Sequence, residues 1–123
     1  MRKYIGNLAS IAVAIGLAAG GALPAAAHAV IVSASPTADQ HVAPGEVAIR
    51  IEFNARIDKV RSRLQVTAPA GGKADVPIDQ AGDPNVIAGT TGALTPGAYV
   101  VRWQVLAIDG HITRGDIPFA VGN

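Results

Sequence analysis

Two stretches of the chain alternate apolar and polar side chains with a period of two. They cover residues 46–53 and 98–106. The apolar set of the first stretch is Val47, Ile49, Ile51 and Phe53, and that of the second is Tyr99, Val101, Trp103 and Val105. Successive side chains of a strand point to opposite faces, so this period predicts two strands with one face in a core.

Shorter β-type runs flank these two stretches. We expect strands at residues 28–33, 64–67, 73–77, 86–89 and 116–121, because Pro and Gly interrupt the chain between them. After residue 27, no long stretch repeats apolar residues at helical spacing. About seven short strands predict an all-β, Greek-key β-sandwich or barrel.

The first 27 residues have the order of a secretory signal. Arg2 and Lys3 supply a positive start, an apolar run follows, and Ala25-Ala26-Ala27 offers small residues for a peptidase. Glycines and Pro24 interrupt the run, which is too short for a spanning helix. We therefore expect a signal peptide at residues 1–27 and an exported domain at residues 28–123, in the periplasm or otherwise in the cell envelope.

The composition of the mature chain excludes several classes of protein and of site. Removing Arg2 and Lys3 leaves eight basic and nine acidic residues, a formal charge of −1, so no basic patch indicates nucleic acid. The absence of cysteine excludes disulfides, a lipid-anchored cysteine and thiolate metal sites. We expect one domain, a monomer without a membrane span after cleavage.

Cleavage after Ala27 makes His28 the first residue. An N-terminal histidine is chemically special, because its α-amine and its ring Nδ1 can bind one metal ion together. The α-amine has an ordinary pKa near 7.7 to 8.0, so a metal displaces its proton at modest cost. His28 is therefore a candidate chelating ligand.

The segment Asp109-Gly110-His111 supplies the other candidates. Its spacing of two allows the carboxylate and the imidazole to converge on one metal ion, and nitrogen-rich ligation with some oxygen suits Cu(II). Asp-Gly is also a strong hairpin signal, so a simple turn is the alternative interpretation. Thr113 and Arg114 are candidates to orient the His111 ring.

Other polar and aromatic positions have plainer interpretations. His41 lies in a polar stretch before Pro44 and reads as an exposed loop histidine. Trp103 lies in the same alternating row as Tyr99, Val101 and Val105, which predicts that it is a core residue. A basic cluster consists of Arg56, Lys59, Arg61 and Arg63, and only Asp58 balances its charge. We interpret this cluster as a solvated face or as a docking surface for an acidic partner.

These residues together resemble the CopC/PcoC copper resistance family. The resemblance lies in residues 28–36, in Ile51-Glu52-Phe53-Asn54, in residues 94–103 and in Asp109-Gly110-His111 with the segment after it, nearly all of residues 28–123. It implies a cupredoxin-like, Ig-like sandwich and one Cu(II) ion per chain, held by His28, Asp109 and His111.

The resemblance also implies a role in copper homeostasis, as a buffer or as a carrier to a membrane importer of the CopD type. Some members hold Cu(I) through methionines, but the one methionine here is Met1, in the signal segment. Two other functions stay open: an oxidative enzyme with a histidine brace around copper, and an adhesion-type module without metal.

Overall fold

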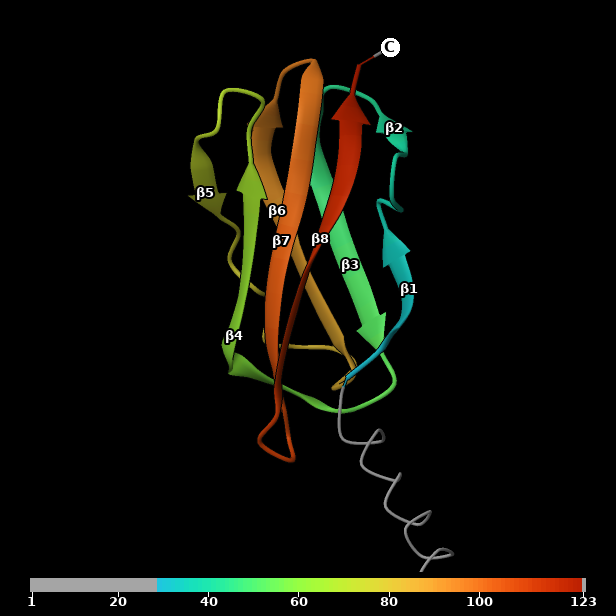
Figure 1. Ribbon diagram of the computed structural model, residues 1–123, viewed down its shortest axis with the longest axis vertical. Coiled ribbons are helices and arrows are strands. Elements are labelled where there is room, and N and C mark those ends of the chain that lie inside the picture. The colour runs from blue at the N-terminus through green and yellow to red at the C-terminus, as the bar shows by residue number, and fades with distance from the viewer. Residues whose placement is uncertain (1–28, 123) are drawn as a thin grey trace, which may run out of the picture.

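The computed structural model describes residues 29–122, which form eight strands and no helix. The strands are β1 (Ile31–Ser35), β2 (His41–Val42), β3 (Gly45–Phe53), β4 (Ile57–Thr67), β5 (Lys73–Asp75), β6 (Val86–Leu94), β7 (Gly97–Ala107) and β8 (Ile112–Val121). They make two sheets, ordered β1-β3-β6 and β2-β8-β7-β4-β5, that pack face to face (Figure 1). In this part of the chain no helix is long and apolar enough to cross a membrane.

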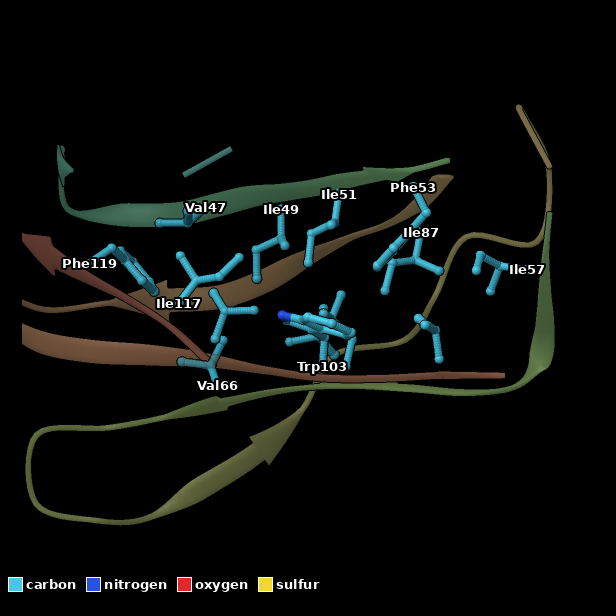
Figure 2. Packing of buried hydrophobic residues seen from close by; sticks show 14 of the residues in the cluster. Val47, Ile49, Ile51, Phe53, Ile57, Val66, Ile87, Trp103, Ile117 and Phe119 are labelled. Carbon is cyan, nitrogen blue, oxygen red and sulfur yellow. The ribbon is translucent and has the colours of Figure 1, made fainter. Parts of the chain in front are cut away.

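The core lies between the two sheets, where the alternating positions of β3 meet those of β7 (Figure 2). Ile51 and Val101 are fully buried, as their alternation predicts. Trp103 is 8% exposed and meets the Phe53 ring edge-on, with the ring centroids 5.3 Å apart. The interpretation of Trp103 as core is confirmed.

The chain passes between the sheets at the β1–β2, β2–β3, β3–β4, β5–β6 and β6–β7 connections, as in Greek-key sandwiches. The β6–β7 corner is closed by Tyr99, whose hydroxyl donates to the Thr95 carbonyl at 2.8 Å. A tyrosine that bonds back a few residues upstream is a known feature of Ig-like sandwiches. The predicted all-β sandwich is therefore confirmed.

Strand bounds differ from the sequence predictions in places. β4 begins at Ile57, whereas the sequence predicted a strand only from residue 64. The pairing of β4 with β7 is irregular between Asp58 and Arg63, so the alternation that predicts a strand is lost there. β6 and β8 are also longer than predicted, β1 begins only at Ile31, and β5 ends at Asp75. The two-residue β2, parallel to the end of β8, was not predicted because two residues carry no period.

The predicted cleavage point after Ala27 lies outside the described residues. In the described part of the chain, the buried hydrophobic side chains, apart from Val86, form one core that runs from Ala29 to Val121. A unit with its own core folds independently. We therefore expect a chain that begins at His28 to fold on its own.

Candidate metal centre

A tight hairpin joins β7 to β8 through residues 108–110. The Gly110 N–H donates to the Ala107 carbonyl at 2.8 Å, and the Ala107 N–H donates to the His111 carbonyl at 2.8 Å. Gly110 has φ +96°, in the left-handed region that glycine adopts at little cost. A three-residue loop that ends in a left-handed residue is a common hairpin connection. The hairpin predicted from Asp-Gly is therefore present.

This turn also brings the two candidate ligands together. Asp109 Oδ1 lies 3.2 Å from His111 Nδ1 and accepts a hydrogen bond from the His111 backbone N–H at 3.1 Å. Both side chains are about half exposed, at 48% and 51%. Two ligands at right angles, each about 2.0–2.1 Å from a metal, are about 2.9 Å apart. The pair therefore fits adjacent positions around one ion after a small adjustment.

The hairpin also favours the charged form of the Asp109 carboxylate. The backbone N–H of His111, donating to Asp109, holds the pKa of that carboxyl below its ordinary value, and the His111 side chain adds to the effect. Partial desolvation acts in the opposite direction. Because a hydrogen bond to the charged form favours that form, Asp109 is an anion at neutral pH. An anionic oxygen beside an imidazole nitrogen suits a divalent cation.

The N-terminal segment enters the sandwich at the same end as this hairpin (Figure 1). The Val30 N–H donates to Asn54 Oδ1 at 2.8 Å, and the Asn54 N–H donates to the Val30 carbonyl at 2.9 Å. Two residues further on, the Arg56 carbonyl accepts from the Ile108 N–H at 3.0 Å. The loop of residues 54–56 thus connects the start of the described chain to the hairpin.

His28 itself lies outside the described residues. Among residues 29–122, no three or more His, Asp, Glu or Cys side chains gather in a way that could hold a metal ion. Asp109 and His111 are therefore a pair of candidate ligands within the described part of the chain, too few to hold a metal ion by themselves. A complete site would draw its remaining protein ligands from elsewhere.

Comparison with known proteins supplies the family. Residues 31–122 match the CopC domain, which is most of the chain. The chain belongs to the CopC family. It is 29% identical over 98 residues to Protein YobA of Escherichia coli (strain K12), covering 77% of this chain and 79% of YobA. It is 27% identical over 99 residues to the Copper transport protein CutJ of Bacillus subtilis (strain 168), covering 78% of this chain but 18% of CutJ.

Two solved structures share this fold. CopC from Methylosinus trichosporium OB3b has a TM-score of 0.71 and 29% identity, over 76% of this chain and 93% of that one. PcoC from Escherichia coli, described as a methionine-rich copper resistance protein, has a TM-score of 0.64 and 25% identity, over 78% of this chain and 100% of that one. The sequence resemblance to the CopC/PcoC family is confirmed.

His41 lies far from the hairpin of this CopC domain. His41 lies in β2 and pairs with Ala120, near the end of β8. His111 immediately precedes Ile112, the first residue of β8. The nine residues from Ile112 to Ala120 are separated by eight steps, which span about 26 Å of strand. His41 is exposed as expected, but it lies in a strand and not in a loop, because β2 adds to the edge of β8.

Thr113 and Arg114 are separated by the alternation of β8. Arg114 is exposed, and its Nε donates to Gln104 Oε1 at 3.1 Å. The role of Arg114 in orienting His111 stays a prediction. Thr113 is half-buried and lies opposite Val105 of β7, which is fully buried. The Thr113 hydroxyl is the one buried side-chain polar atom without a hydrogen-bond partner in the described part.

Proposed function

We propose that this CopC-family chain is an exported protein that holds one Cu(II) ion through His28, Asp109 and His111. The observation that carries the proposal is the 3.2 Å approach of Asp109 Oδ1 to His111 Nδ1, beside the segment that follows His28. The amine and ring of His28 add two nitrogens to this pair. Three nitrogens and one oxygen make a donor set that suits tetragonal Cu(II).

The chain then acts in copper homeostasis and resistance, either as a periplasmic buffer or as a carrier. A membrane importer of the CopD type is the receiving partner that we propose. The likeness to CutJ supports this role, because CutJ is named a copper transport protein. The matched region is 18% of the length of CutJ. A signal peptide at residues 1–27, cleaved to expose the His28 amine, is part of the same proposal.

The family assignment weighs against the two other functions. The CopC family consists of copper-binding resistance proteins and not of enzymes, which disfavours an oxidative enzyme. A carboxylate ligand from Asp109 would also occupy a position that an oxidative copper centre keeps open for its substrate. For an adhesion module, Asp109-Gly110 would be only a turn; here the turn also aims the carboxylate at His111.

The decisive experiment compares two forms of the mature protein. One begins at His28, and the other carries one extra residue before it, which turns the α-amine into an amide and leaves every side chain in place. We expect the first form to bind one equivalent of Cu(II) tightly with a nitrogen-rich tetragonal electron paramagnetic resonance signal, and the second to bind far more weakly. Equal affinity of the two forms, or no binding, overturns the proposal.

A further inference from the structure

Three arginines lie close together on the outer face of the five-stranded sheet. They are Arg63 of β4, Arg102 of β7 and Arg114 of β8, and all three are exposed. Arg63 lies opposite Gln104 of β7, and Gln104 lies opposite Arg114, so these three residues form a row across the sheet, which we call the arginine row. The face that carries it is turned toward the viewer in Figure 1.

A hollow of about 290 Å³ opens on this face, and all three arginines line it. Among the described residues that line the hollow, Asp116 alone is acidic, so the lining carries two net positive charges. The mature chain as a whole carries a formal charge of −1. Positive charge is therefore concentrated at this hollow, against the balance of the rest of the chain.

The three arginines differ in how far their charge is already paired. Arg102 Nε lies 3.2 Å from Asp116 Oδ1 and forms an ion pair. Arg114 donates only its Nε, to the neutral Gln104 Oε1 at 3.1 Å, and the Arg63 guanidinium has no hydrogen-bond or ion-pair partner within residues 29–122. Two guanidiniums without a carboxylate therefore flank Gln104, on strands about 10 Å apart.

The side-chain amide of Gln104 adds a third donor between them. An arginine side chain only donates hydrogen bonds, so the Gln104 oxygen has to face Arg114, which leaves the amide nitrogen as a donor. That nitrogen has no hydrogen-bond partner within residues 29–122. The row thus offers hydrogen-bond donors to an anion, and the planar forks of its two guanidiniums match carboxylates in particular.

The structure also divides the basic cluster that the sequence indicates. Lys59 Nζ donates to the Ala81 carbonyl at 3.0 Å, and Arg61 Nη1 lies 3.5 Å from Asp58 Oδ2. These two cations have partners within their own neighbourhood. Arg63 instead lines the hollow together with arginines of β7 and β8, which are distant in the sequence.

We propose that the arginine row is a docking face for an acidic segment of a partner protein. The occupant has to project into the hollow, which carboxylate side chains on a peptide segment do and a planar bilayer does not. The net negative charge of the mature chain opposes a polyanion such as nucleic acid. Arg114 follows His111 by three residues, about 10 Å of strand, so a docked segment lies beside the candidate metal pair.

The first test titrates the mature, metal-free protein with a short peptide of alternating Glu and Gly, and with a matched peptide that carries Gln in place of Glu. The fluorescence of Trp103, which also lines the hollow, follows binding. We expect the acidic peptide to bind at least about tenfold more tightly than the neutral one, and high salt to reduce this difference. Equal affinity for the two peptides, or binding of neither, overturns the proposal.

Two double variants test where the peptide binds. Arg63→Gln with Arg114→Gln should lower the affinity for the acidic peptide by about tenfold or more, because both guanidiniums without a carboxylate are lost. Arg50→Gln with Arg56→Gln changes the net charge equally away from the hollow and should leave the affinity nearly unchanged. All four arginines are exposed, so both variants keep the core. Equal losses in the two variants overturn the docking face.

The single variant Gln104→Glu tests the row itself. A carboxylate between Arg63 and Arg114 pairs with their guanidiniums and repels the carboxylates of the peptide, so the affinity should fall at least as far as in the first double variant. Gln104→Asn keeps an amide and the charge of the chain, and should lower the affinity less. An unchanged affinity of the Glu variant contradicts the proposal.

The remaining controls separate the possible occupants and the two proposals. Inorganic phosphate, or vesicles of phosphatidylglycerol, that bind as tightly as the peptide and depend equally on Arg63 and Arg114 overturn a partner segment as the occupant. The docking face needs no metal, so it is tested apart from the proposed function. A chain that binds Cu(II) but not the acidic peptide overturns the docking face alone, and one that binds the peptide but no Cu(II) overturns the proposed function alone.

Discussion

The chain contains two Asp-x-His segments with the same spacing, at opposite ends of the sandwich. In Asp109-Gly110-His111 the carboxylate lies 3.2 Å from the ring nitrogen. In Asp39-Gln40-His41, no ion pair joins the two side chains among the contacts of the described residues. Instead, the Asp39 backbone N–H donates to the Pro118 carbonyl at 2.7 Å, and His41 lies in β2, where it pairs with Ala120.

The position of the left-handed residue accounts for the difference. In the hairpin that residue is Gly110, between Asp109 and His111, and the chain folds back so that the two side chains meet. In the other segment it is Asp39 itself, with φ 64°, after which the chain extends into a strand. In this chain the Asp and His side chains converge in the segment whose left-handed residue lies between them.

Removing each histidine in turn tests the difference between the two segments most directly. His111→Ala should weaken Cu(II) binding by more than about 100-fold, which exceeds the usual effect of removing a group beyond the ligands. His41→Ala, its matched control, should leave affinity unchanged, because it lies about 26 Å of strand away. Competition titration with a copper chelator measures both. A comparable loss in the two variants contradicts the assignment of the site.

A smaller effect is expected from the turn. Gly110→Ala puts a Cβ on a residue with φ +96°, which costs about 1–2 kcal/mol. Chemical denaturation should record this loss, and copper affinity should fall as the pair moves apart. Gly110→Asn should lose less of both, since Asn tolerates the left-handed region better than Ala. Identical stability of the wild type and both variants would show that the hairpin does not depend on Gly110.

The smallest expected effect comes from Thr113, which has no counterpart at the His41 end. Its buried hydroxyl lacks a hydrogen-bond partner within residues 29–122, so Thr113→Val should raise the free energy of unfolding by about 1 kcal/mol. Thr113→Ser keeps the hydroxyl and should not stabilise. Urea denaturation of the metal-free proteins measures both changes. Destabilisation by Val would mean that the hydroxyl forms a bond in solution.

Much of the fold follows from local pattern. The rows that contain Ile51 and Val101 alternate without interruption, and both residues are fully buried. The first half of β4 was missed because charged residues and an irregular pairing hide its period between Asp58 and Arg63. β2 was missed because its pairing with β8 joins residues almost eighty positions apart, which no local pattern records.

The all-β class, the rows that fill the core, and Asp109 and His111 as candidate ligands all follow from local pattern, because strand period and turn chemistry are local properties. Local pattern does not say which Asp-x-His segment converges, that His41 lies at the far end, or that Val30 and Ile108 share the loop of residues 54–56. These depend on contacts between segments distant in the chain, which form only when the two sheets pack.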